Sequence, residues 1–353
     1  MKLIKLRHFL AAWVAASLVF AASTVGAASK CTLVKVADWP IRLERNRVMV
    51  DGAINGQKIG IILDTGAQRS LILRSATERL RLTRQEVRGY RMFGVGGETH
   101  VEAASIDEFS VGSLTRKNWR VIVAGERDFG GDAAFLLGED LFYQLDIEFD
   151  LAHRAVRLFQ PKDCDGVSLA YWATDGVSEV TIEAVYEAQP QILLTVQING
   201  QPVQALLDSG AAASVLNKPE AARLGVTPDS PGVVARGSGS GLGGKSVDFW
   251  IGPFQSVIIG NEAIKDTNIG FAELWRGAAP VPIGSHLPET AGWTPSMLLG
   301  ADFLNAHRLF IAHSQRKLYF TYEGGPVFQP KAPAEARRAP TPESDTKGGA
   351  EAK

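Results

Sequence analysis

Two aspartates in this sequence stand in nearly the same setting. Residues 62–67 read ILDTGA and contain Asp64, and residues 206–211 read LLDSGA and contain Asp208. A single Asp-Thr/Ser-Gly triplet recurs by chance in many proteins, so one copy indicates little. Two carboxyl groups held face to face, however, form an acid–base pair in which one group accepts a proton and the other donates one. The chemistry therefore depends on whether the surroundings of the two aspartates repeat as well.

The surroundings repeat in register. An INGQ segment precedes each aspartate at the same distance, at residues 54–57 and 198–201. Farther along each copy, an apolar pair is followed by glycine, in LLGEDLF at residues 136–142 and in LLGADFL at residues 298–304. An internal duplication explains this order of motifs, and each copy contributes one carboxylate.

The elements that must position these carboxylates are predicted to be mostly β-strands. Each Asn-Gly pair lies between apolar runs, which is a strong signal for a β-hairpin. The run after each turn ends at the aspartate, so we expect the carboxylate where a buried strand breaks into a glycine-containing turn. Short helices are predicted at residues 75–81 and 218–224, the second with Asn217 as its N-cap and Pro219 in its first turn.

Each copy also contains a glycine-rich hairpin tip between its aspartate and its apolar pair. The tip of the first copy comprises Gly94, Val95, Gly96 and Gly97. The tip of the second copy lies within residues 237–244 and is centred on Gly241, Leu242 and Gly243. The two tips differ in length and composition, so we expect an asymmetric binding site.

The second tip also matches a phosphate-binding pattern. Residues 239–246 read GSGLGGKS, which fits the Walker A motif. That motif binds phosphate only when a strand precedes it and a sustained helix follows it. Residues 247–251 are predicted to form a strand instead, and Gly252-Pro253 would end any helix. A hairpin tip is therefore favoured, and no nucleotide is expected to bind.

Taken together, the motifs resemble those of the retropepsin-like aspartic peptidases of the pepsin superfamily, in the exported, two-lobed form found in bacteria. The resemblance covers residues 41–322 and rests on both aspartate turns, both glycine-rich tips and both Leu-Leu-Gly elements. It implies a mainly-β fold with two tandem β-barrel lobes related by a pseudo-twofold axis. It also implies that Asp64 and Asp208 share one water molecule as a catalytic dyad in an aspartic endopeptidase.

The resemblance also implies roles for the residues around the pair. Thr65 and Ser209 would interlock through their hydroxyl groups beneath the carboxylates, and Gly66 and Gly210 would let the two turns approach closely. The glycine-rich tips would be flaps over a bound peptide or an unfolded protein chain. No metal or cofactor is implied, and the histidines show no metal-ligand spacing.

Proton sharing explains why two carboxylates are needed. Two carboxylates at close range cannot both stay ionised, and the aspartic-protease pair is itself the standard example of this effect. Ala67 and Ala211 follow the two glycines, and alanine cannot donate a side-chain hydrogen bond that would lower a carboxyl pKa. We therefore predict a pH optimum in the mildly acidic rather than the strongly acidic range.

Two alternatives to a catalytic pair within one chain are considered. In the first the pair is not catalytic, and in the second it forms between two chains. The chain could be a catalytically inactive, two-lobed peptide-binding protein of the cell envelope. Alternatively, Asp64 could pair with Asp64 of a second chain; we favour a monomer, because residues 161–190 are long enough to connect two lobes that pair within one chain. Asp140 and Asp302, which follow the Leu-Leu-Gly elements, are interpreted as structural residues that bind backbone or an arginine.

Composition and the N-terminus indicate an exported protein. The 353 residues carry 37 basic and 38 acidic side chains without a basic stripe, so no nucleic-acid partner is expected. Residues 1–28 combine a positively charged start with an uncharged stretch and small residues at 25–27, which predicts a signal peptide. Uncleaved, the same stretch of roughly 20 residues would be long enough to anchor the protein in a membrane. The periplasm is the expected location.

The two cysteines and the changes in composition complete the predicted organisation. Cys31 and Cys164 are predicted to form a disulfide in an oxidising compartment, the alternative being two buried thiols. We predict a first lobe at residues 29–160, a connector at 161–190, a second lobe at 191–328 and a disordered tail at 329–353. The second lobe is longer around residues 274–297, either to shape a cleft or as a surface insertion.

Overall fold

The computed structural model describes residues 31–90, 92–126, 128–183, 191–275 and 294–328. The predicted signal peptide, the predicted tail and most of the extra segment of the second lobe lie outside these residues. The fold is mainly β, with 53% strand and 8% helix, and contains two closed six-stranded barrels in tandem. The predicted fold class is therefore confirmed.

The first barrel is built on the hairpin that leads to Asp64. Its strands follow the order β3 (Arg47–Ile54), β4 (Gln57–Leu63), β11 (Ala133–Leu137), β5 (Leu71–Leu73), β10 (Leu114–Ala124) and β9 (Glu102–Val111), and β9 pairs with β3 to close the ring. Two short strands, β2 (Arg42–Glu44) and β6 (Arg84–Glu86), flank the barrel. Asn55 and Gly56 have φ values of 49° and 76°, which suit the tight turn between β3 and β4.

The second barrel repeats this order with its own strands. They are β15 (Leu193–Ile198), β16 (Gln201–Leu207), β21 (Met297–Leu299), β17 (Val215–Asn217), β20 (Glu262–Ala272) and β19 (Val247–Ile259), and β15 pairs with β19 to close the ring. One further strand, β18 (Val234–Gly239), extends the sheet beyond β19. Asn199 and Gly200 again occupy the left-handed region at the hairpin turn. The duplication in sequence is thus a duplication of fold.

Each barrel has two short helices, and each helix directly follows one of the barrel strands. They are α1 (Arg74–Arg79), α2 (Glu139–Phe142), α3 (Lys218–Arg223) and α4 (Ala301–Ala306). Asn217 is the N-cap residue of α3 and Pro219 lies in the first turn, as predicted, but the Asn217 side chain makes no capping hydrogen bond. Its Oδ1 instead accepts a hydrogen bond of 3.2 Å from the backbone N–H of Leu274.

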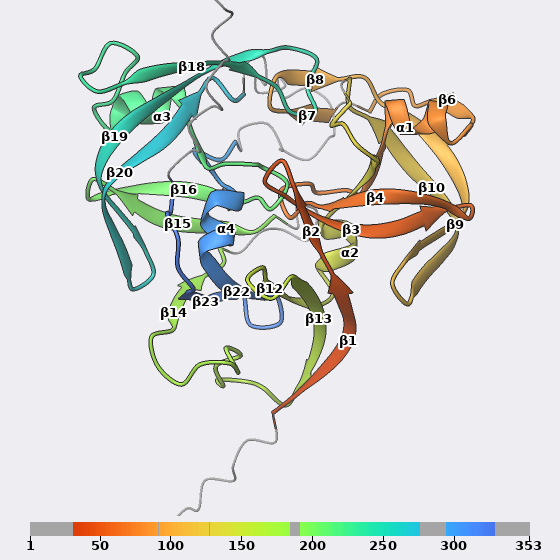
Figure 1. Ribbon diagram of the computed structural model, residues 1–353, viewed down its shortest axis with the longest axis horizontal. Helices are drawn as coiled ribbons and strands as arrows, with labels where there is room; N and C mark the ends of the chain where they lie inside the picture. Colours follow the sequence, from red (N-terminus) through yellow and green to blue (C-terminus); the bar gives the residue numbers. More distant parts are fainter. Residues whose placement is uncertain (1–30, 91, 127, 184–190, 276–293, 329–353) are drawn as a thin grey trace, which may run out of the picture.

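A third sheet joins the two lobes and was not predicted. Its strands follow the order β1 (Thr32–Pro40), β13 (Ala155–Lys162), β12 (Asp146–Asp150), β22 (His307–Ala312), β23 (Lys317–Tyr322) and β14 (Ser178–Thr181). The central pair, β12 and β22, comes from different halves of the chain. In Figure 1 this sheet lies at the bottom of the molecule, with the two barrels above it and β7, β8 and β18 at the top. Part of the predicted connector, β14, is one of the two edge strands of this sheet.

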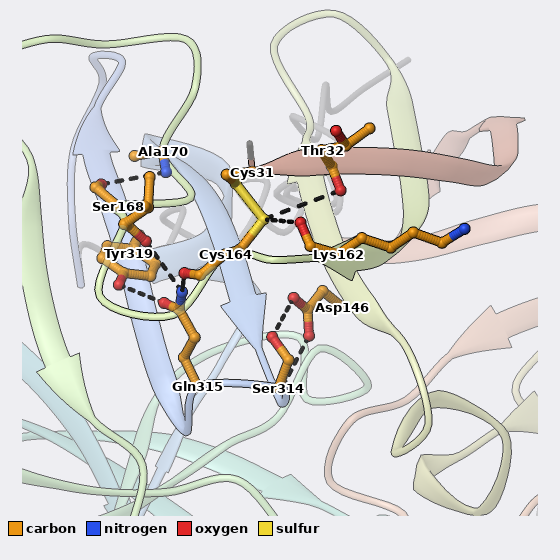
Figure 2. Close-up of a disulfide and its surroundings, with 11 residues drawn as sticks. Cys31, Thr32, Asp146, Lys162, Cys164, Ser168, Ala170, Ser314, Gln315 and Tyr319 are labelled. Carbon is orange, nitrogen blue, oxygen red and sulfur yellow. Dashed lines mark hydrogen bonds between the residues drawn. A yellow bond between two sulfur atoms is a disulfide. The ribbon is translucent and has the colours of Figure 1, made fainter. Parts of the chain in front are cut away.

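The disulfide lies at the outer end of the joining sheet. Cys31 and Cys164 are bonded across a sequence separation of 133, connecting the start of β1 to the segment after β13 (Figure 2). The backbone carbonyl of Cys164 accepts a hydrogen bond of 2.7 Å from Gln315 Nε2, in the turn between β22 and β23. The bond therefore ties the N-terminal strand to a region that already contacts the second half of the chain.

A buried carboxylate connects the two halves across the joining sheet. Glu148 on β12 is completely buried and accepts hydrogen bonds from Arg157 Nη1 at 2.9 Å, Arg308 Nε at 2.8 Å and Tyr171 Oη at 2.8 Å. Arg308 belongs to β22, so one of these ion pairs crosses between the lobes. Removing one partner from a buried ion pair is strongly destabilising, because the remaining charge stays buried without compensation.

Replacing this carboxylate should loosen the junction between the lobes. Glu148→Gln is expected to lower the free energy of unfolding by about 3–5 kcal/mol, because two guanidinium groups lose their buried counter-charge. Urea denaturation followed by circular dichroism measures the change. The matched control is Glu179→Gln, which breaks an exposed pair with Lys317 at 2.6 Å and should cost about 0–1 kcal/mol. Equal losses in the two variants would contradict a special role for Glu148.

Candidate active site

Each aspartate is held at the end of a strand by the Leu-Leu-Gly element of its own copy. Asp64 follows β4, and its backbone N–H donates to the carbonyl of Leu137 at 2.9 Å. Asp208 follows β16, and its backbone N–H donates to the carbonyl of Leu299, also at 2.9 Å. The parallel pairs β4–β11 and β16–β21 therefore fix the starting point of both turns.

The turn after each aspartate points backbone N–H groups at its carboxylate. Asp64 Oδ1 accepts hydrogen bonds from Gly66 at 3.1 Å and from Ala67 at 3.0 Å. The corresponding bonds to Asp208 Oδ1 measure 3.0 and 2.9 Å. Hydrogen bonds from N–H groups favour the ionised form of a carboxyl group. Each aspartate side chain is therefore oriented by its own turn, independently of the opposite lobe.

The two turns approach each other so closely that only glycine fits. A Cβ atom added to Gly66 would lie 2.5 Å from Asp208 Cγ, and one added to Gly210 would lie 2.5 Å from Asp64 Cγ. Any side chain at either glycine would collide with the opposite carboxyl group. Each carboxyl group therefore lies against the opposite turn, close enough to affect the pKa of the other.

The hydroxyl residues interlock beneath the carboxyl groups. The backbone N–H of Thr65 donates to Ser209 Oγ, and that of Ser209 donates to Thr65 Oγ1, both at 3.0 Å. The Thr65 hydroxyl then donates to the carbonyl of Leu207 at 2.8 Å, and the Ser209 hydroxyl to that of Leu63 at 2.7 Å. Thr65 and Ser209 are completely buried. Both halves of this arrangement belong to one chain.

Burial raises the pKa values of both aspartates, and the two carboxyl groups affect each other unequally. For Asp64, burial is the larger cause and the nearby charge of Asp208 the second, and together they raise its pKa well above the ordinary value. Burial also raises the pKa of Asp208, but the N–H groups of its turn, a hydrogen bond with Asp64 and the charge of Arg47 partly oppose this effect. The pair therefore keeps a proton at a pH where an exposed aspartate has lost it.

Sequence analysis missed a buried carboxyl group close to Asp64. Glu139 is completely buried, and neither of its carboxyl oxygens has a hydrogen-bond partner among the described residues. Burial, followed by the charges of Asp64 and Asp140, raises its pKa well above the ordinary value. Its nearest basic group is His313 Nε2 at 3.4 Å, and burial lowers the pKa of that imidazole to about 4. The available signal was the Ala301 that occupies the same motif position in the second copy.

The aspartates that follow the Leu-Leu-Gly elements have structural contacts. Asp140 Oδ1 accepts hydrogen bonds from the backbone N–H and the hydroxyl of Ser70, at 2.8 and 2.6 Å. Asp302 Oδ1 makes the same two contacts with Ser214, at 2.8 and 2.6 Å. These partners agree with the interpretation of both residues as structural, with a serine in place of the suggested arginine.

The two glycine-rich tips meet. The first is the turn between β7 (Met92–Gly94) and β8 (Gly97–Thr99). The carbonyl of Val95 accepts hydrogen bonds from the N–H groups of Gly241 and Gly243, both at 3.1 Å, and the carbonyl of Gly96 accepts one from Lys245 at 3.0 Å. The Val95 side chain packs on a core cluster of the second lobe, and Leu242 packs on the core that includes the first barrel.

The second tip is a connection between strands. It lies between β18 and β19, and the residues after the GSGLGGKS segment are the first residues of β19. The helix that a phosphate-binding loop requires is therefore replaced by a strand, as the sequence analysis predicted. Gly97 also lies in this contact region, as the first residue of β8.

Within the described part of the chain, no group of three or more His, Cys, Asp or Glu side chains has an arrangement that could hold a metal ion. Likewise, no helix among these residues is both long enough and apolar enough to cross a membrane.

Two tandem β-barrels whose equivalent turns bring two Asp-Thr/Ser-Gly aspartates together define a retropepsin-like fold. Comparison with protein families gives the same result. The family described as "Aspartyl protease" matches residues 50–141 and 194–303, one match in each barrel and more than half of the chain in total. The chain belongs to this aspartyl protease family. A comparison with curated proteins found no match.

Proposed function

We propose that this protein is an aspartic endopeptidase that hydrolyses peptide bonds with a water molecule activated by Asp64 and Asp208. The observation that carries the proposal is the interlocked pair of turns, which places two buried carboxyl groups in direct contact within one chain. An inactive peptide-binding protein would have no need for a carboxyl pair that is costly to bury. Family membership supports proteolysis in general terms.

The proposed mechanism uses one proton shared by the pair. The ionised carboxylate accepts a proton from water as the water attacks the peptide carbonyl, and the protonated carboxyl group donates its proton toward the carbonyl oxygen. The amine then leaves with a proton, and the pair returns to its starting state. Because the two groups titrate together, the proton is assigned to the pair and not to one aspartate.

The surroundings support a peptide substrate in an oxidising compartment. The meeting tips, with Val95 and Leu242 on opposite lobes, are proposed to close over an extended peptide and exclude water. Separation of the tips would be needed for the peptide to enter. The disulfide supports an exported location, for which we propose the periplasm. The proposed substrate is an unfolded protein or a peptide, and the proposed active form is a monomer.

The direct test is cleavage of an unfolded protein by the full chain between pH 3 and pH 7. Peptide products, blocked by a statine-containing peptide that imitates the tetrahedral intermediate, are expected. Binding of the statine peptide without cleavage of any substrate would instead support the alternative, an inactive peptide-binding protein. Neither binding nor cleavage would contradict both functions.

The pH optimum is expected to be mildly acidic rather than strongly acidic. Hydrolysis needs one proton on the pair, so the rate should fall when both groups are protonated and again when both are ionised. Both pKa values are raised, so this window should lie above the ordinary aspartate value of about 3.9. A profile of kcat/KM against pH measures the two limits. A maximum below about pH 3 would contradict the prediction.

A further inference from the structure

Arg47 is a cation beside the carboxyl pair that has no carboxylate of its own. It is the first residue of β3, and its Nε donates a hydrogen bond of 3.2 Å to the carbonyl of Gly210, in the turn of the opposite lobe. Its guanidinium carbon lies 4.8 Å from the centre of the Phe129 ring. Among the described residues, no carboxylate lies within ion-pair distance of Arg47.

Other partly buried arginines of the described chain differ in this respect. Arg42, Arg74, Arg157 and Arg308 each pair with at least one carboxylate. Arg47 is also partly buried, and an arginine removed from water normally has a charged partner because its desolvation is costly. The charges of Asp64 and Asp208 act on Arg47 from beyond ion-pair distance, so the place of a direct partner is open to a carboxylate from outside the chain.

The terminal N–H groups of Arg47 have no partner among the described residues. They are nevertheless not among the buried atoms that lack a partner. Arg47 is half-buried, so its side chain borders space that solvent reaches. Gly210 contacts the carboxyl group of Asp64, so this space lies next to the reacting groups. In agreement, burial lowers the pKa of Arg47, whereas the charges of Asp64 and Asp208 oppose that shift.

The two lobes differ at this position. Arg47 and Gln191 stand at the same distance before Asp64 and Asp208 respectively, so they are equivalent in the duplicated sequence. Gln191 is neutral, and its side-chain oxygen is buried without a partner. At this pair of equivalent positions, a positive charge is therefore present in the first lobe and absent from the second.

We infer that Arg47 forms a subsite for an acidic side chain, Asp or Glu, of the peptide substrate on one side of the scissile bond. The inference rests on the proposed function, because that function places an extended peptide across the carboxyl pair. Arginine suits this task because its planar guanidinium group can donate two parallel hydrogen bonds to one carboxylate. Phe129 and the carbonyl of Gly210 hold the group in place, so little side-chain freedom is lost on binding.

The test compares matched peptides that differ by one carboxylate. Sites of cleavage are first mapped in an unfolded protein, and peptides around one site are then made with Glu or Gln at each of the three positions on either side. Both peptide ends are blocked, so that the side chain supplies the only carboxylate. We expect Glu to be preferred over Gln by about tenfold in kcat/KM at one position, on one side only. The preference should disappear below about pH 4, where Glu becomes protonated.

Variants of Arg47 then test whether this residue recognises the carboxylate of the substrate. Arg47→Gln, which copies the equivalent Gln191, should reduce the Glu/Gln ratio to about one. Arg47→Glu should favour Lys over Gln at the same position, a gain that misfolding cannot produce. The matched control is Arg45→Gln, which removes a nearby exposed charge that contacts the carbonyl of Phe129 and should leave the ratio within about twofold. Because each ratio is taken within one variant, an effect of Arg47 on the pKa of the pair cancels.

Failure of the inference and failure of the proposed function give different results. If the wild type cleaves peptides but shows equal rates for Glu and Gln at all six positions, the inference is wrong and the peptidase stands. If nothing is cleaved, the affinities of the Glu and Gln forms of a statine peptide are compared by calorimetry instead of the cleavage rates. A Glu preference in binding that Arg47→Gln removes would support the subsite in a protein that is not a peptidase. Equal binding of the two forms, or no binding, would overturn it.

Discussion

Asp208→Asn is expected to reduce hydrolysis of an unfolded protein by about 10³-fold or more. The expected loss lies toward the upper end of the range of about 10²–10⁴ that one positioned acid–base group contributes. An asparagine keeps the shape of the side chain but can neither be the ionised base nor share the proton. Asp64→Asn should have the same effect, because the pair acts as one unit. The exposed Asp107 provides a matched control, and Asp107→Asn should leave the rate unchanged.

The same substitution should make the folded protein more stable at neutral pH. A carboxyl group whose pKa is raised in the folded state stabilises it fully below the unfolded value of about 3.9, and this contribution is lost as pH rises through the folded pKa. At pH 7 the wild type therefore carries the cost of ionising a buried pair, which asparagine removes. The melting temperature of Asp208→Asn should exceed that of the wild type, by about 2–4 °C for each kcal/mol, and the difference should shrink toward pH 4.

These two readouts together separate a catalytic role from a structural one. A variant that is inactive and also less stable at pH 7 would indicate that Asp208 mainly supports the fold. Mixing Asp64→Asn with Asp208→Asn tests the origin of the pair. Because Thr65 and Ser209 interlock within one chain, the mixture should stay inactive. Recovery of activity in the mixture would show that pairs form between chains.

Loss of the disulfide is expected to have the largest effect on stability. Replacing Cys31 and Cys164 by alanine should lower the free energy of unfolding by up to about 5 kcal/mol, because the bond closes a loop with a sequence separation of 133 in the unfolded chain. Urea denaturation of the oxidised wild type, the reduced wild type and the double variant measures this value. Alkylation of the denatured, unreduced protein should label neither cysteine, whereas two free thiols would both be labelled.

The position of the disulfide also predicts what should not change. Figure 1 places the joining sheet, where the disulfide lies, at the opposite side of the molecule from the strands of the glycine-rich tips. Below its melting temperature, the double variant should therefore cleave peptides with the kcat/KM of the wild type. A loss of stability below about 1 kcal/mol would mean that the unfolded chain is already compact around these residues. A selective loss of activity would mean that the joining sheet affects the geometry of the carboxyl pair.

The local motifs were readable from sequence because each depends on neighbouring residues. The Asn-Gly turns at Asn55 and Asn199 need a left-handed backbone. The strands on either side show alternating apolar and polar residues or continuous apolar runs. The turn after each aspartate satisfies its carboxylate within three residues, so Asp-Thr/Ser-Gly-Ala is a complete local unit. Duplication of these units was enough to predict two mainly-β lobes and a pair of aspartates.

Only the tertiary structure decided how the two halves are joined and which charges surround the pair. The joining sheet pairs β12 with β22, and the local pattern of a strand does not specify which distant strand becomes its partner. Arg47 and Glu139 stand in motifs that look like ordinary strand and helix ends, so nothing in their neighbours indicated a role. Their effect on the pair comes from distance and burial, and both are set by the packing of one lobe against the other.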